Sequence, residues 1–379
     1  MYKVRDLTNG EPAKLIFIMA LPLLAGNIVS QLYGFVDTLV VGRFLGVEAM
    51  AAVGCAGFAT AFIAVTFGTA IALMMNVQAD LIRALGNTEI PTKVWSATLL
   101  MNAVFDVIAI VIFDCGIIGC VMFFVYTEKQ IPLLHSAFNG EYFTLDEDFV
   151  LEHLKLGLPV GFQGAIIAIG GVILQVAINQ LGSSEVAAVT AGQRIEGLTL
   201  MFFLTFAQVI SSFAAQNYGA ERYERIIDGV KKCAAITVAV SLAITAFNII
   251  FGADILNILL KDSHSHVIEQ GTFYIVVNGL FYWVFGLIAV FRMALQGLGK
   301  NKVPMLSSSI ELVVKLLVAL FLIDQLGFMG ICLASPLAFV YSCLPLTVAV
   351  LRERKKIREL LGEDEDKTEP EIATLALSK

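Results

Sequence analysis

The hydrophobic residues of this chain come in long runs that short polar connections separate. Many runs reach the ~20 residues that a helix needs to cross a hydrocarbon core, and they lack the two-residue alternation of membrane barrel strands. Because no water reaches the backbone at that depth, each run must satisfy its own hydrogen bonds and is expected to be helical. The expected helices cover residues 15–43, 49–80, 92–113, 117–134, 155–181, 185–213, 232–251, 267–294, 304–323 and 328–350.

Short motifs repeat between the two halves of the chain. Leu21-Pro22 recurs as Leu158-Pro159 at an offset of 137 residues, and Leu85-Gly86 recurs as Leu298-Gly299 at an offset of 213. The offset grows by 76 residues, so the first half lacks a stretch that the second half keeps. We therefore expect an all-α polytopic membrane protein with two pseudo-symmetric helical lobes, about three to four spans in the first and six in the second.

The same pattern divides the chain into four predicted parts. Residues 1–134 form an abridged N-terminal transmembrane lobe, 135–154 a cytoplasmic linker between the lobes, 155–351 a six-helix transmembrane lobe and 352–379 a charged cytoplasmic tail. Ala49 to about Ala79 is expected to be one continuous helix, since no Pro, Lys or Arg interrupts it.

Basic residues indicate which ends of the helices face the cytoplasm. The loops at 182–184 and 324–327 carry no Lys or Arg. By the positive-inside rule, the alternating basic connections and both termini are cytoplasmic, which predicts a multi-pass protein of the plasma (inner) membrane. The basic residues are Lys3, Arg5, Lys14, Arg222, Arg225, Lys231, Lys232, Lys300, Lys302, Arg352, Arg354, Lys355, Lys356 and Arg358.

Composition excludes most other classes of protein. The chain is 58% hydrophobic and 15% charged, with a mean hydropathy of +0.82, which is far from the balance of a soluble domain. Its net charge of −7 is not a field of the whole protein, because the acids concentrate at 141–152 and 363–371, and no nucleic acid is expected as a partner. The six cysteines show no CxxC spacing, so no metal site is expected. Without HExxH, GxSxG or DDxxD, we expect no enzyme, no catalytic residue and no cofactor.

Ionisable residues inside the spans are costly to bury and are therefore functional candidates. Asp37 lies late in the first span, and Asn102 and Asp106 share one helix face at a spacing of four residues. Their oxygens suit a small cation or a titrating proton, because burial raises the pKa of a carboxylate. The alternative is that these acids lie at helix ends and reach lipid headgroups or cap a neighbour.

Further polar residues in the spans suit structural roles as well as transport. Arg194 and Glu196 are two residues apart, so they do not face each other on a helix. We assign Gln31, Arg194 and Glu196 to lining a cavity or pairing helices. Glu311 and Lys315 are four residues apart and are expected to neutralise each other.

Four segments together resemble the multidrug and toxic compound extrusion (MATE) family of transporters: Leu21-Pro22, Gln31–Gly46, Arg83–Pro91 and Gln216–Ala220. The resemblance covers nearly the whole chain up to about Arg358. It implies two lobes around a central cavity that opens alternately to either side. It also implies that entry of Na⁺ or H⁺ drives export of small amphiphilic, often cationic, drugs and other xenobiotic compounds.

The resemblance also implies a site for the coupling ion. In one branch of the family, an aspartate of helix one and an Asn-x-x-x-Asp pair of helix five bind the ion, and Asp37, Asn102 and Asp106 match these positions. The chain departs from the family where its first half is short, which removes part of the lobe that would hold this site.

Two other functions remain open at this point. One is a non-transporting MATE-like membrane protein, either degenerate or dependent on a partner, which the missing stretch favours. The other is a flippase of lipid-linked precursors. It would favour a cationic central cavity, and the few bases noted inside the spans, Arg194 and Lys315, argue mildly against it.

Overall fold

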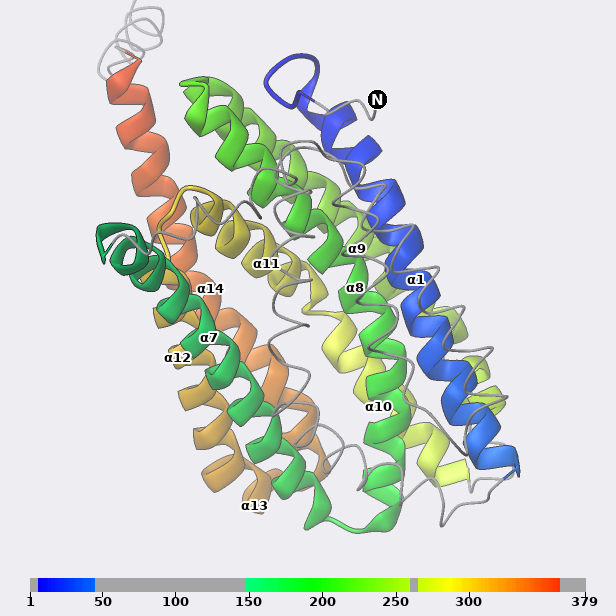
Figure 1. The fold of residues 1–379 in the computed structure, drawn as a ribbon. Helices are drawn as coiled ribbons and strands as arrows, with labels where there is room; N and C mark the ends of the chain where they lie inside the picture. The colour runs from blue at the N-terminus through cyan, green and yellow to red at the C-terminus, as the bar shows by residue number, and fades with distance from the viewer. Residues whose placement is uncertain (1–5, 45–146, 260–264, 362–379) are drawn as a thin grey trace, which may run out of the picture.

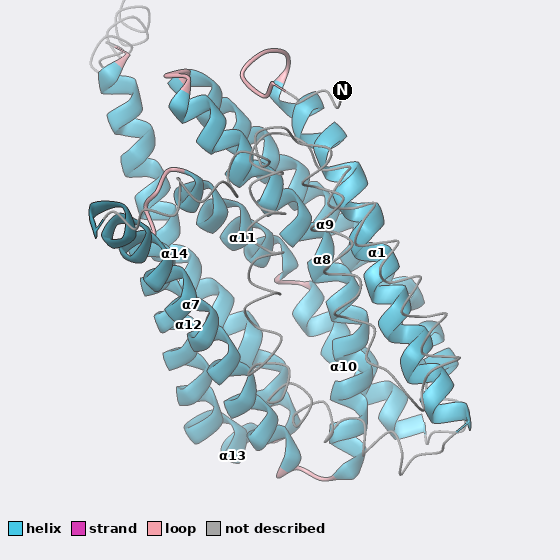
Figure 2. Ribbon diagram, viewed as in Figure 1, coloured by secondary structure: helices cyan, strands magenta, loops and turns pink. Residues whose placement is uncertain are grey.

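The computed structural model describes residues 6–44, 147–259 and 265–361 (Figure 1). These ranges contain helices joined by short loops and no strand (Figure 2). The expected helices at 49–80, 92–113 and 117–134 lie outside them. The helices are α1 (Pro12–Phe44), α7 (Glu147–Asn179), α8 (Ser183–Gly219), α9 (Tyr223–Leu259), α10 (Ser265–Gly279), α11 (Tyr282–Gly297), α12 (Lys302–Leu317), the π-helical turn η3 (Val318–Leu322), α13 (Ile323–Leu326) and α14 (Phe328–Leu360).

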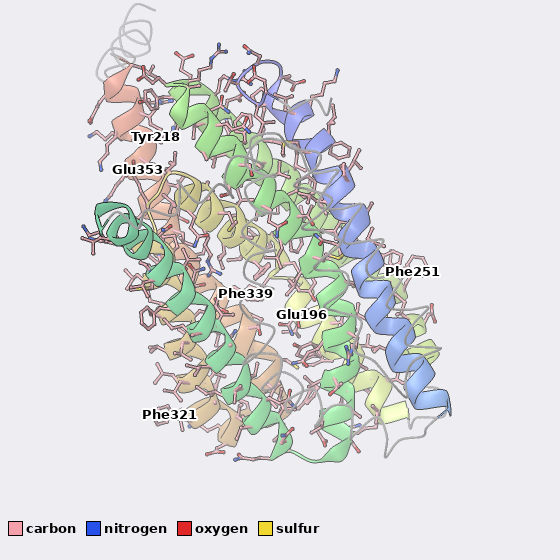
Figure 3. The ribbon with its side chains drawn as sticks, in the orientation of Figure 1. Glu196, Tyr218, Phe251, Phe321, Phe339 and Glu353 are labelled. Atoms are coloured by element: carbon pink, nitrogen blue, oxygen red, sulfur yellow. The ribbon has the colours of Figure 1, made fainter. Side chains whose placement is uncertain are left out.

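The second half has the six spans that the hydropathy pattern predicts. Within the described residues, five helices are long and apolar enough to cross a membrane, and the bent pair of α10 and α11 makes a sixth. Large apolar side chains cover the outside of the bundle. Phe251 and Phe321, which Figure 3 labels, are examples and are 45% and 61% exposed. Such a surface suits hydrocarbon rather than water. The all-α polytopic fold is therefore confirmed.

Several helices extend beyond the predicted spans. The span expected at 232–251 belongs to α9, which runs from Tyr223 to Leu259. α7 begins at Glu147, inside the stretch assigned to the linker, and α14 continues to Leu360, inside the stretch assigned to the tail. Helical hydrogen bonds continue past the membrane boundary, whereas the apolar pattern that marks a span stops there.

One predicted span is wrong in shape. Residues 267–294 were expected to form a single helix, but α10 and α11 meet at a bend of 48°. The hydroxyl of Thr245, on α9, donates a 2.6 Å hydrogen bond to the carbonyl of Gly279, the last residue of α10. A side chain that donates to a helix carbonyl in this way can interrupt the hydrogen bonds within the helix and bend it.

Two glycines lie where the chain reverses between helices. Gly182 precedes α8 with φ of 123°, and Gly299, of the repeated Leu298-Gly299 pair, lies in the turn between α11 and α12 with φ of 73°. Residues with a Cβ rarely adopt these angles, so glycine is favoured at these turns. Leu298-Gly299 therefore marks the end of α11.

The helices pack in two connected groups. α8 lies against α1, α9, α10 and α11, whereas α12 lies against α7 and α14. α11 joins the groups because it contacts α8, α9 and α14. Gly297 permits a close approach of the α11 and α8 backbones, since a Cβ there would lie 2.4 Å from the backbone oxygen of Ser211 on α8.

The N-terminal segment is fastened to the turn between α8 and α9. The side chain of Leu7 is fully buried in an apolar core that includes Phe213. Asn217 donates a 3.2 Å hydrogen bond to the carbonyl of Leu7, and Arg222 donates one of 2.8 Å to that of Thr8. These contacts place the start of α1 with the helices of the second half, although the predicted boundaries of the lobes remain a prediction.

The segment also has its own turn. Hydrogen bonds from the side chain and backbone of Thr8, together with one from the side chain of Asn9, hold the pKa of Asp6 below its ordinary value. The carboxylate is solvent-exposed, and its hydrogen bonds fix the loop that leads into α1.

Candidate functional site

The residues predicted to bind the coupling ion lie mostly outside the described structure. Asn102 and Asp106 fall in residues 45–146. Gln31 and Asp37 lie on the backbone of α1, but their side chains are not described. Whether Asp37, Asn102 and Asp106 converge therefore stays a prediction, and the described polar site belongs to the second half.

A buried carboxylate joins α8 to α10. Glu196 is 8% exposed, and the hydroxyl of Tyr274 donates a 2.8 Å hydrogen bond to its Oε2. Gly192 lies one turn earlier on α8, and a Cβ there would come within 2.6 Å of the Tyr274 ring. The missing side chain thus makes room for the tyrosine to reach across to the acid.

Arg194 does not take part in the contact between Glu196 and Tyr274. It is exposed, whereas Glu196 two residues later is buried, as their spacing on one helix requires. The described geometry thus gives Glu196 a role in pairing helices and leaves Arg194 on the surface of the described part.

A second buried acid, Glu311 on α12, is shared by two bases. Lys315 Nζ lies 2.8 Å from Glu311 Oε1, one turn along the same helix, which confirms the predicted pair. Arg292 Nη2, from α11, lies 3.5 Å from Glu311 Oε2. All three side chains are about nine-tenths buried, so their charges attract one another in a medium of low dielectric constant.

Sequence reasoning missed Arg292. The residue lies within the predicted span 267–294, so a search of that span for bases would have found it. Its link to Glu311, 19 positions away on another helix, leaves no mark in the sequence.

Lys315 links the pair of Glu196 and Tyr274 to the ion pairs around Glu311. This side chain interacts electrostatically with Glu196, and its stem lies beside Gly170 of α7, where a Cβ would be 3.4 Å from Lys315 Cδ. With both acids ionised, the two bases Lys315 and Arg292 balance them. We call these five residues, Glu196, Tyr274, Arg292, Glu311 and Lys315, the polar cluster.

Some hydrogen-bonding capacity beside the polar cluster is unused. Among the described residues, the buried Tyr282 hydroxyl, Asn278 Oδ1 and Arg292 Nε have no hydrogen-bond partner. Tyr282 begins α11 and Asn278 lies near the end of α10, so both flank the bend. Buried polar atoms are costly when unpaired, so a site with such atoms can accept a proton or a polar group. No group of three or more metal-ligating acids, histidines or cysteines occurs in the ranges that the structure describes.

Comparison with known proteins indicates a family. Residues 159–321, which contain all five residues of the polar cluster, match the family model MatE. This segment is therefore similar to the MATE family, whose members are transporters rather than enzymes. The apolar helices make the chain a multi-pass membrane protein.

Individual MATE relatives are distant in sequence. The chain is 20% identical over 313 residues to the probable multidrug resistance protein YpnP of Bacillus subtilis, a match that covers 59% of this chain and 69% of that protein. It is 19% identical over 315 residues to the multidrug export protein MepA of Staphylococcus saprophyticus, covering 79% and 68%.

Solved structures share the MATE fold more clearly. The bent form of the Vibrio cholerae MATE transporter VcmN superimposes with a TM-score of 0.72 at 17% identity, covering 92% of this chain and 98% of that one. At this identity the likeness establishes the two-lobed helical fold and nothing about substrates.

Proposed function

We propose that this chain is a cation-coupled antiporter, driven by Na⁺ or H⁺, that exports small amphiphilic or cationic compounds by alternating access. The observation that carries the proposal is the match of residues 159–321 to the MatE family model. The charge-balanced polar cluster supports it, because buried ionisable groups in a membrane protein are costly and mark functional positions.

The coupling ion is proposed to bind in the first half, at Asp37, Asn102 and Asp106. Two carboxylates that share a site repel each other, so a proton or Na⁺ between them relieves the repulsion. Releasing that cation then favours a different arrangement of helices, because a ligand shifts an equilibrium by its different affinities for the two states. The polar cluster already holds its own cations, Lys315 and Arg292, so the coupling ion is assigned to the first half.

The chain is proposed to sit in the plasma (inner) membrane with both termini in the cytoplasm. The basic turn between α8 and α9 contacts the N-terminal segment, and Lys300 in the turn between α11 and α12 pairs with Glu353 on α14. The basic segments therefore lie at the same end of the bundle (Figure 1). This arrangement supports one cytoplasmic face under the positive-inside rule.

The test measures transport in variants of the proposed coupling site. Everted vesicles that contain the wild-type chain should accumulate a cationic dye such as ethidium in their lumen when a Na⁺ or H⁺ gradient is applied. Asp106→Asn should reduce this transport at least tenfold without loss of membrane expression. Asp324→Asn is the matched control, because Asp324 is exposed on the short helix α13 and lies outside the proposed site.

Full transport by Asp106→Asn would refute the coupling site. A wild-type chain that reaches the membrane and moves no dye under either gradient would favour the non-transporting alternative. The flippase alternative gains little from the structure, because the additional buried base, Arg292, is neutralised by Glu311.

A further inference from the structure

A groove opens between α9, α11 and α14 at the end of the bundle that carries the basic turns. Its volume is about 600 Å³. Apolar side chains form most of its wall, including Phe291 and Leu295 of α11, Val230 of α9 and Val350 of α14. The polar cluster does not contribute to it, so the groove is separate from the candidate site described above.

The groove changes from apolar to charged along α14. Val350 and Leu351 line its deeper part, and Leu351 is 54% exposed, as expected of a side chain that faces lipid. Arg354 and Arg358 follow one and two turns later and line its outer part. Figure 3 labels Glu353 at this level of α14. The groove thus crosses the level at which acyl chains give way to headgroups.

The charges at the outer part leave an excess of bases. Three acids line the groove, but Asp228 pairs with Lys232 at 2.9 Å, and Glu353 pairs with both Lys300 and Lys356. These three lysines lie outside the groove lining. Glu224 is then the one lining acid without an ion pair among the described residues, against the lining bases Lys231 and Arg354.

Two of the bases are available to a ligand. Lys231 and Arg354 are exposed and make no ion pair or hydrogen bond within the described part of the chain. Lys231 comes from α9 and Arg354 from α14, so the two cations reach the groove from different helices. Basic pockets between membrane helices on the cytoplasmic side are typical binding sites for anionic lipid headgroups.

We propose that this groove binds an anionic phospholipid of the cytoplasmic leaflet. Its phosphate lies between Lys231 and Arg354, and one acyl chain lies along Val230, Phe291 and Val350. A peptide occupant fits less well, because its backbone groups would lose hydrogen bonds against the apolar wall, whereas an acyl chain has none to lose. This site goes beyond the proposed transport activity and does not depend on it.

The experiment counts bound lipids on the full chain in detergent micelles by native mass spectrometry. Phosphatidylglycerol and phosphatidylcholine are titrated separately, and the wild-type chain should prefer phosphatidylglycerol. Each basic residue near a membrane surface contributes about a fivefold effect, so Lys231→Gln with Arg354→Gln should weaken phosphatidylglycerol binding about thirtyfold. Binding of phosphatidylcholine should not change.

The matched control removes the same charge beside the groove. Arg352 and Lys355 are exposed on α14 and do not line the groove, so Arg352→Gln with Lys355→Gln should keep the preference. Ala234→Trp should reduce binding of both lipids, because Ala234 lines the groove and the indole would occupy the space of an acyl chain. Size-exclusion elution and the melting temperature verify that each variant is folded.

Two results would overturn the proposal. Equal losses in the two double variants would mean that surface charge attracts the lipid without a site. Preference for phosphatidylglycerol that appears only after residues 363–379 are deleted would mean that the acidic tail occupies the groove.

Discussion

Glu311 should be the most sensitive member of the polar cluster, because it is the acid that both buried bases share. Glu311→Gln leaves Lys315 and Arg292 buried without their carboxylate, and breaking a buried pair in this way costs about 3–5 kcal/mol. Lys315→Met removes one cation but leaves Glu311 paired with Arg292 at 3.5 Å. Its cost should be that of one charged hydrogen bond, about 1.5–3 kcal/mol.

Thermal unfolding of the purified variants in detergent tests this order. A difference of about 2 kcal/mol corresponds to roughly 4–8 °C for a unit of about 200 residues, so Glu311→Gln should melt below Lys315→Met by that amount. Adding Lys315→Met to Glu311→Gln should raise the melting temperature again, because it removes the cation that the loss of Glu311 leaves in excess.

This partial rescue distinguishes charge from packing. If the loss came from packing, the second substitution would lower the melting temperature further. Lys315→Met that is as damaging as Glu311→Gln, or a double variant that melts lowest of the three, would refute the view that Glu311 holds the cluster together.

Two further predictions concern packing and orientation. Gly297→Ala should destabilise the fold by at least about 2 kcal/mol, since its Cβ would meet the Ser211 backbone at 2.4 Å, whereas Gly219→Ala, with nothing within 4 Å, should be neutral in the same melting assay. Cysteines introduced at Gly219 and at Ser184 should react with an impermeant maleimide from opposite sides of the membrane; labelling of both from one side would contradict the cytoplasmic assignment of the α8–α9 turn.

Hydropathy located the spans because burial in hydrocarbon acts on each helix separately. The same reasoning found the pair of Glu311 and Lys315, whose spacing on one helix brings them together. It could not find the bend between α10 and α11, because the hydroxyl that takes the Gly279 carbonyl comes from Thr245 on another helix. Asn278-Gly279 interrupts the apolar run at the bend and is a turn signal, but the mean hydropathy of the span hides it.

The polar cluster likewise combines residues that one helix reveals with partners that only the packing of several helices reveals. Glu196 was recognised as a candidate from its place in a span, but its partner Tyr274 is 78 positions away. Arg292 and the groove likewise depend on how α9, α11, α12 and α14 pack, which no single-helix pattern contains. The positions of Asp37, Asn102 and Asp106 relative to one another stay predictions, because their side chains are outside the described structure.

The N-terminal fastening has a consequence for synthesis. The carbonyl of Leu7 cannot accept its hydrogen bond until Asn217, 210 positions later, has been synthesised. At ~5–20 residues per second, a ribosome needs about 10 to 40 s to make that intervening chain. The first helix must therefore persist in the membrane through this interval without its final partner. Its packing against α8 therefore begins only after more than half of the chain has been made.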